Sequence, residues 1–213
     1  MKGEGLVLST AYFATIRYFS VLLSDATVCY IERHENYVKQ SYRNRCTIYS
    51  ANGLLDLVVP VAKSVKPKIP VAEVEISYDM TWQKQHFKAI ESAYRRSPFY
   101  EFYIDDLMLF FNCRHRYLYD YNMHILRTIC TMINIPFRVQ ESQTYISTTD
   151  ACIDYRNIIH PKVVQQHLDI FPQYTQVFSE KWGFKPNLSI LDLLFNMGPE
   201  SKNYIKNIVS PLF

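Results

Sequence analysis

The stretch "LVLSTAYFATIRYFSVLLSDATVCYIE", from Leu6 to Glu32, carries the signals for two strands and the helix between them. Its first residues, Leu6–Ser9, form a short apolar run that predicts a strand. From Tyr12 the apolar side chains recur at helical intervals, which predicts a helix to about Ser24. The segment "DATVCYIE" then predicts a second strand. A strand, helix, strand order favours a parallel strand pair, so the chain begins as an α/β protein.

Further strands are predicted on both sides of a helical middle segment. The runs "RCTIYS" and "LLDLVVPV" flank Asn52 and Gly53, a two-residue turn signal typical of an antiparallel hairpin. Alternating side chains in "VAEVEIS" (71–77) and "FRVQESQTYIS" (137–147) predict two more strands. We therefore expect an α/β fold with a mixed sheet.

The middle and the end of the chain are predicted to be helical. Residues 82–97 place an apolar stripe on one helix face, and residues 105–133 predict one or two further helices. Residues 148–182 are mostly loop, and "LSILDLLFNMG" then predicts a short helix that Gly198 ends. Asp192 follows Ser189 by three positions, which is typical of a capping box at a helix start. The length of 213 residues fits a single domain spanning 1–213.

Composition argues against several classes of protein. The net charge of +3 is spread along the chain, so nucleic-acid binding is the least favoured function. Five cysteines without a CxxC pair argue against a disulfide framework and a zinc knuckle, and they favour the cytoplasm. We expect no membrane span, no metal site and no bound cofactor, because the sequence has no long apolar run, metal-ligand spacing, P-loop or GxGxxG. The 17 tyrosines and 13 phenylalanines suit a thick core, and equally stacking on a sugar or base.

The densest polar segment, "RHENYVKQSYRNRC", follows the second predicted strand. Glu32, His34 and Asn36 emerge near the carboxyl end of that strand, where ligands bind in open α/β sheets. An imidazole beside Glu32 or Glu35 is a pairing that acid/base catalysis uses. A polar loop rim after a strand is the alternative reading of the same residues.

Arg43 and Arg45 are predicted to share one face of the next strand, with Asn44 opposite and Lys39 close in sequence. Two adjacent guanidiniums hold a phosphate or carboxylate through forked hydrogen bonds. A charged edge strand that resists aggregation explains the same pattern.

The remaining candidates also have plain alternatives. His86 lies on the apolar stripe of its predicted helix, which favours a hydrogen-bonded core residue over a catalyst. His160 lies in a long loop and is a candidate ligand or acid/base group. Tyr174 and Gln176 suit the recognition of hydroxyl groups, and they are equally common in turns.

Several long strings resemble the WbqC-like protein family in the family's order, among them "YFSVLLSDATVCYIERHENYVKQSYRNRCTI", "WQKQHFKAIESAYRRSPFYEFY" and "LSILDLLFNMGPES". The resemblance covers about Leu6 to Ser201. Family members typically carry a histidine just after the first strand, and Leu8 stands there in this sequence. The resemblance therefore implies that an enzymatic role needs another base, with His34 the nearest substitute. The family's asparagine–arginine pair and helix histidine are matched by residues of this chain, namely Asn44, Arg45 and His86.

The resemblance implies a group transferase of bacterial surface polysaccharide or O-antigen synthesis, with aminoacyl or glycyl transfer to an aminosugar or nucleotide sugar as the reaction. The partner would be a small molecule, such as a nucleotide sugar or an amino acid. Tyr12, Tyr18 and Tyr174 would stack on or bond to the sugar. The alternative is a non-catalytic ligand-binding or scaffold protein of the same pathway, which the missing histidine favours.

Overall fold

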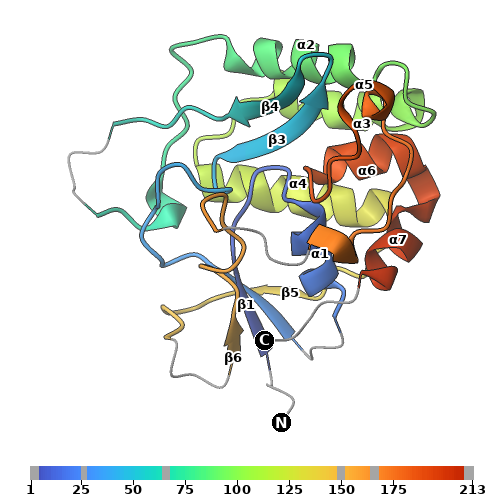
Figure 1. The fold of residues 1–213 in the computed structure, drawn as a ribbon. Helices are drawn as coiled ribbons and strands as arrows, with labels where there is room; N and C mark the ends of the chain where they lie inside the picture. The colour runs from blue at the N-terminus through green and yellow to red at the C-terminus, as the bar shows by residue number, and fades with distance from the viewer. Residues whose placement is uncertain (1–4, 25–27, 64–67, 148–151, 164–167, 209–213) are drawn as a thin grey trace.

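A computed structural model describes residues 5–24, 28–63, 68–147, 152–163 and 168–208 (Figure 1). Its main sheet has four strands in the order β5-β2-β1-β6, and every neighbouring pair is parallel. The strands are β1 (Gly5–Ser9), β2 (Val28–Glu32), β5 (Val139–Glu141) and β6 (Cys152–Asp154). The α/β class is therefore confirmed.

The N-terminal strand, helix, strand unit is confirmed, with β1 and β2 paired from Gly5↔Val28 to Ser9↔Glu32. The helix α1 (Ile16–Leu22) begins later than predicted. Backbone pairing explains the delay, because Ile16 N donates to Leu188 O and Ala14 O accepts from Ile190 N. The part of the second predicted strand at 25–27 lies outside the described residues.

The predicted hairpin is also confirmed, as β3 (Arg45–Ser50) and β4 (Gly53–Val58). Gly53 takes φ +100°, a conformation that side-chain-bearing residues rarely adopt. This hairpin forms a second, two-stranded sheet, drawn above the parallel sheet in Figure 1. Parallel and antiparallel pairs thus occur in two separate sheets.

The strand predicted at 71–77 is wrong. Val71–Glu73 form a short 3-10 helix, η1, and Glu75 and Ile76 make only isolated bridges to Tyr117 and Val61. The segment bonds to irregular loops on both sides, since Val71 N donates to Glu35 O and Ile76 N to Arg116 O. The strand predicted at 137–147 shortens to β5.

Helices pack beside and behind the two sheets (Figure 1). The region predicted as one or two helices contains two, α3 (Tyr100–Asn112) and α4 (Leu118–Met132), after α2 (Trp82–Tyr94). Gln83 explains the break, because its amide donates to Phe110 O and Cys113 O at the end of α3. The remaining helical elements are η2 (Leu168–Ile170), α5 (Ser179–Trp182), α6 (Ile190–Met197), η3 (Gly198–Glu200) and α7 (Ser201–Asn207).

None of the helices in the described part of the chain combines the length and the apolar character that crossing a bilayer requires.

Candidate functional site

The strand order makes the carboxyl end of β1 the candidate position for a ligand. From β1 the chain moves outward on one side to β2 and β5, and it then returns to the other side as β6. Neighbouring strands that continue in opposite directions leave a crevice at their carboxyl ends, where open α/β sheets bind ligands. Here that position lies between Ser9 and Asp154, the last residues of β1 and β6.

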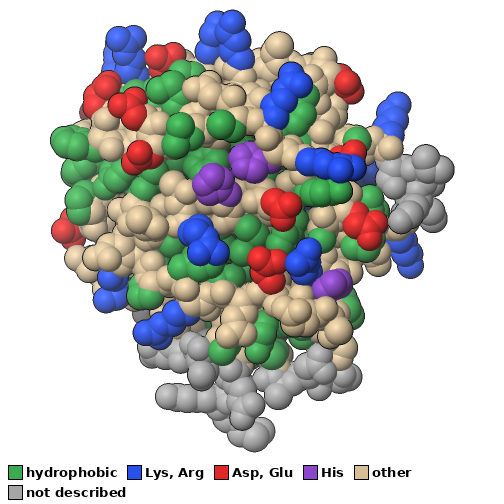
Figure 2. Space-filling model, turned by 180° about the vertical axis from the view of Figure 1, so that it is seen from behind, with side chains coloured by type: hydrophobic (Ala, Val, Ile, Leu, Met, Phe, Trp, Pro, Cys, Tyr) green, Lys and Arg blue, Asp and Glu red, His purple; other side chains and the backbone are tan. Residues whose placement is uncertain are grey.

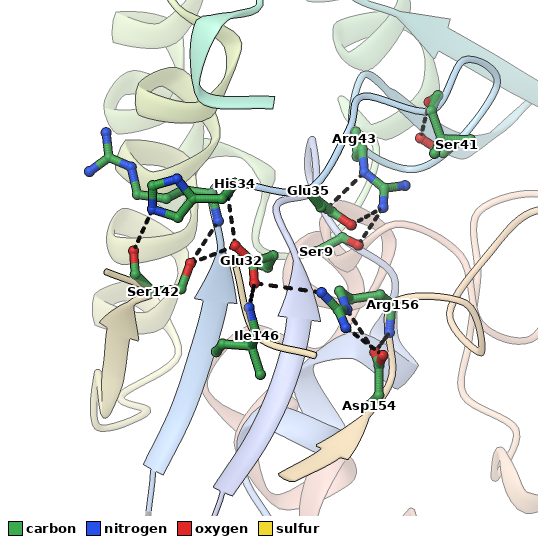
Figure 3. A network of polar contacts seen from close by, with 12 residues as sticks. Ser9, Glu32, His34, Glu35, Ser41, Arg43, Ser142, Ile146, Asp154 and Arg156 are labelled. Carbon is green, nitrogen blue, oxygen red and sulfur yellow. Dashed lines mark hydrogen bonds and ion pairs between the residues drawn. The ribbon is translucent and has the colours of Figure 1, made fainter. Parts of the chain in front are cut away.

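Glu32 ends β2 at this edge and is fully buried, with a relative exposure of 0%. Its carboxylate accepts hydrogen bonds from Ser142 Oγ at 2.7 Å, Ile146 N at 2.7 Å and His34 N at 2.8 Å (Figure 3). Arg156 Nη1 lies 3.5 Å from Glu32 Oε2. A buried carboxylate needs this many partners, because burial removes the water that would otherwise solvate its charge.

Asp154 and Arg156 form the second part of the cluster. Arg156 donates to the Asp154 carboxylate from Nε at 2.9 Å and from Nη2 at 2.7 Å. Burial alone would raise the pKa of Asp154, but the side-chain and main-chain hydrogen bonds from Arg156 outweigh it and lower the pKa. The guanidinium also lies under the ring of Tyr145, with 5.0 Å between Cζ and the ring centroid.

Glu35 and Arg43 form the third part. Arg43 Nε donates to Glu35 Oε1 at 2.9 Å, and Nη2 donates to Glu35 Oε2 at 2.5 Å. Nη2 also bonds Ser9 Oγ at 2.8 Å, which ties the pair to the end of β1 (Figure 3). The side chains of Arg43 and Glu35 are 4% and 9% exposed, so this is a buried ion pair. We call Ser9, Glu32, Glu35, Arg43, Ser142, Asp154 and Arg156 the edge network.

The predicted Arg43–Arg45 clamp is not formed. Arg45 Nη1 bonds Asp56 on the hairpin at 3.3 Å, whereas Arg43 turns toward Glu35 and Ser9. Asn44 is buried and donates to Val59 O, so it fixes the entry to the hairpin. The two guanidiniums therefore hold different carboxylates.

A small cavity adjoins the edge network between the ends of β1 and β6. Its volume of about 10 Å³ is close to the space that one water molecule needs. Thr10 Oγ1 is buried there without a hydrogen-bond partner among the described residues, and Tyr18 Oη donates to Ser9 O in the same wall. The lining residues are Leu8, Ser9, Thr10, Ala11, Tyr18, Tyr42, Arg43, Tyr155 and Ile159.

His34 lies at the edge network, but its imidazole does not pair with Glu32 or Glu35. The Glu32 carboxylate accepts from the main-chain N of His34, while the ring Nε2 lies 3.2 Å from Ser142 O (Figure 3). With Nε2 donating to that carbonyl, Nδ1 carries the lone pair. Asn36 and Lys39 are exposed and make no side-chain hydrogen bond to the network within the described ranges.

Tyr12 and His86 pair with each other, away from the network. Tyr12 Oη and His86 Nδ1 are 2.9 Å apart, and both residues are buried among aromatic rings that include Trp82 and Tyr121. Burial lowers the pKa of His86 to about 4. This geometry fits the expected core role of His86 and gives Tyr12 the same role.

His160 lies near Arg43. Its Nδ1 accepts from Lys162 N at 3.1 Å. Burial lowers the pKa of His160, and the positive charges of Arg43 and Lys162 lower it further. A neutral imidazole thus stands beside the edge network at neutral pH.

Tyr174 and Gln176 belong to a separate buried cluster around Asp192. Tyr174 Oη donates to Asp192 Oδ2 at 2.5 Å, and Gln176 Nε2 donates to the same oxygen at 2.8 Å. The capping-box interpretation of Asp192 is therefore wrong, although Ser189 Oγ does cap α6 by accepting from Leu191 N. Burial raises the pKa of Asp192 to about 6, although these hydrogen bonds favour the carboxylate.

We expect Asp192→Asn to change how stability depends on pH. The native state holds the Asp192 proton more tightly than the unfolded chain, so wild-type stability falls as the pH rises from about 4 to about 6. Asparagine does not titrate in this range, so the variant lacks this fall in stability. Relative to wild type, the variant should gain up to about 3 kcal/mol between pH 4 and pH 7. Urea unfolding at both pH values measures the difference, and a gap that stays constant with pH contradicts the prediction.

Sequence reasoning missed Asp154, Arg156 and Ser142. Residues 152–156, "CIDYR", lie in the stretch predicted as loop, and the strand they begin is only three residues long. A usable signal is a carboxylate at the end of a short apolar segment with an arginine just after it, as with Glu32 and Arg33 at the end of β2.

Comparison with known proteins relates this chain to one family over most of its length. The model of the "WbqC-like protein family" matches residues 10–162 and 160–204. A protein of Mycobacterium tuberculosis, named "Uncharacterized protein Rv1507c", is 27% identical over 235 residues, covering 97% of this chain and 98% of its own length. No solved structure matches. On the breadth of the family match, the chain belongs to the WbqC-like protein family.

Proposed function

We propose that this protein is a group transferase of bacterial surface-polysaccharide synthesis, which passes an aminoacyl or glycyl group to the amine of an aminosugar or nucleotide sugar. The observation that carries the proposal is the edge network, five charged side chains gathered at the carboxyl ends of a parallel sheet. Sites of chemistry concentrate charged groups in this way, at a cost in desolvation that a stability role alone does not require.

The charge balance of the network favours an amine-bearing acceptor. Glu32, Glu35 and Asp154 supply one more carboxylate than the guanidiniums of Arg43 and Arg156 neutralise. An ammonium group of the substrate restores the balance, whereas a phosphate placed among these carboxylates increases the repulsion. The network would therefore bind the amine end of the acceptor, and a nucleotide moiety would lie outside it.

Acyl transfer then requires a base for the amine. The bound ammonium first gives one proton to His34 Nδ1. The amine nitrogen then attacks the acyl carbon, the bond from that carbon to its carrier breaks, and the carrier leaves with the bonding electron pair and the second amine proton. Hydrogen bonding of Nε2 to Ser142 O holds the imidazole in the required tautomer. General-base catalysis contributes ~10²- to 10⁴-fold, so His34→Gln should lower turnover by about that factor.

A thermal-shift screen tests binding first. Aminosugars, nucleotide sugars, nucleotides and amino acids are added to the full chain, and a ligand at 100 times its dissociation constant should add about 2.7 kcal/mol of stability. We expect the amine-bearing sugars to respond and their N-acetylated counterparts to respond less. A response only to nucleotides without an amine contradicts the charge argument.

Matched carboxylate variants locate the response. Asp154→Asn removes a carboxylate of the edge network, while Asp56→Asn removes one that pairs with Arg45 on the hairpin. Each variant is compared with its own ligand-free melting temperature. The ligand response should fall in Asp154→Asn and persist in Asp56→Asn, and equal responses would place the ligand elsewhere.

A non-catalytic ligand-binding protein is the second candidate, and Leu8 favours it. This side chain is fully buried and lines the small cavity at the carboxyl end of β1, where it offers no acid or base. Binding of an aminosugar without turnover in the wild type, and with equal affinity in His34→Gln and His160→Gln, would favour this second function.

A further inference from the structure

A pair of histidines, His115 and His124, lies outside the edge network. His115 Nε2 and His124 Nδ1 are 3.4 Å apart. Within the described part of the chain, these are the two histidine rings that contact each other. Two histidine side chains lie next to each other near the middle of the face shown in Figure 2. His124 is exposed and His115 half-buried, so solvent reaches the pair.

The spacing of the two nitrogens matches metal coordination. Zn–N bonds of roughly 2.0–2.1 Å at a tetrahedral angle place two ligand nitrogens about 3.3–3.4 Å apart. At 3.4 Å, one ring can donate its N–H to the lone pair of the other. A metal ion replaces that shared proton but lies beside the line between the two nitrogens, so both rings must turn to aim their lone pairs at it.

The surrounding structure holds the rings in place and leaves room for further ligands. Tyr78 Oη accepts from His115 N at 2.9 Å and donates to His115 O at 3.0 Å, which fixes the backbone of this loop residue. The His124 ring packs edge-on against Phe110, with centroids 4.9 Å apart. Aromatic support on one side and solvent on the other leave the facing nitrogens accessible.

Asp120 is placed to become a third ligand. It lies one turn before His124 on α4, so the two side chains share a helix face. Across the described ranges no three side chains form a ready metal cluster, so Asp120 must change rotamer to bind.

The two arginines beside His115 contact other side chains. The Arg114 guanidinium lies over the Tyr78 ring at 5.0 Å, and Arg116 pairs with Glu75 at 2.8 Å. We propose that His115 and His124 form a binding site for a transition-metal ion of the Zn²⁺ or Cu²⁺ type, completed by Asp120 and water. Imidazole ligands suit both ions, and Cu²⁺ should bind more tightly.

Metal titration of the full chain tests this site. Zn²⁺ is titrated at neutral pH against a chromophoric chelator, for wild type and for His115→Gln, His124→Gln and Asp120→Asn. We expect one Zn²⁺ per chain in wild type and a loss of more than about tenfold in affinity for each histidine variant. Equal affinity in wild type and both histidine variants overturns the site.

Two controls separate this site from other metal-binding side chains. His34→Gln and Cys113→Ser remove an exposed imidazole and an exposed thiol elsewhere, and both should keep wild-type affinity. The electron paramagnetic resonance spectrum of bound Cu²⁺ should show coupling to two imidazole nitrogens, and to one in His124→Gln. Loss of Zn²⁺ binding in Cys113→Ser, with both histidine variants unchanged, assigns the metal to the thiol and overturns the proposal.

Discussion

Replacing Arg43 by methionine should destabilise the protein by about 3–5 kcal/mol, because it leaves the Glu35 carboxylate buried without its counter-charge. Methionine is shorter than arginine but comparable in volume, and it lacks the guanidinium, so the lost interactions are mainly electrostatic. The guanidinium makes three hydrogen bonds, two to Glu35 and one to Ser9. Urea unfolding measures the change in the free energy of unfolding.

A double variant separates the cost of the unpaired Glu35 carboxylate from the cost of lost packing. In the Arg43→Met background, Glu35→Gln removes the uncompensated carboxylate and should recover most of the lost stability. Arg45→Met is the matched control, because the ion pair with Asp56 is 25% and 46% exposed, and it should cost far less. An Arg43→Met effect no larger than that of Arg45→Met would contradict the buried-pair interpretation.

The Gly198→Ala variant should also be strongly destabilised, by roughly 2–5 kcal/mol. Gly198, the first residue of η3 directly after α6, takes φ +53°, a conformation that a side chain disfavours by about 1–2 kcal/mol. A Cβ at this position would also lie 2.5 Å from the Phe99 ring, and overpacking of this kind costs roughly 1–3 kcal/mol. Urea unfolding again measures the loss.

Two other glycines provide the control for the backbone effect. Gly53 and Gly183 also have positive φ, but a Cβ at either position meets nothing within 4 Å. Alanine there should cost only the conformational part. The steric part should disappear when Gly198→Ala is made in a Phe99→Ala background, and a cost that is unchanged in that background would refute the contact with Phe99.

The elements that could be predicted are those whose sequence pattern reflects local contacts, within the element or with the next one along the chain. The first strand, α1 and the hairpin follow from local periodicity and from the Asn52–Gly53 turn. Residues 71–77 also alternate, but their backbone bonds go to two irregular loops, so alternation alone gave the wrong element. The three-residue strand β6 has too few residues to show a period, and its pairing with β1 defines it.

The candidate site was predicted in its position and only partly in its contacts. Glu32 lies at a strand end, as expected, but spacing by two aligns side chains only while the strand continues. The chain turns after Glu32, so its carboxylate meets the His34 main-chain N instead of the imidazole. Arg43 lies before β3, which starts at Arg45, so it shares no strand face with Arg45, and its guanidinium bonds Glu35 and Ser9. Such partners come from distant segments that no local pattern contains.

The hydrogen bonds that Glu32 accepts from Ser142 and Ile146 affect when the sheet can fold during synthesis of the chain. The two ends of the Glu32–Ser142 bond are 110 positions apart in the chain. The central strands β1 and β2 therefore leave the ribosome long before either outer strand exists, with a carboxylate that has no partner yet. Contacts this distant in sequence slow folding, because the loop between them must close first. The parallel sheet and its polar edge can thus be completed only late in synthesis, and a nascent chain that ends before β5 lacks both.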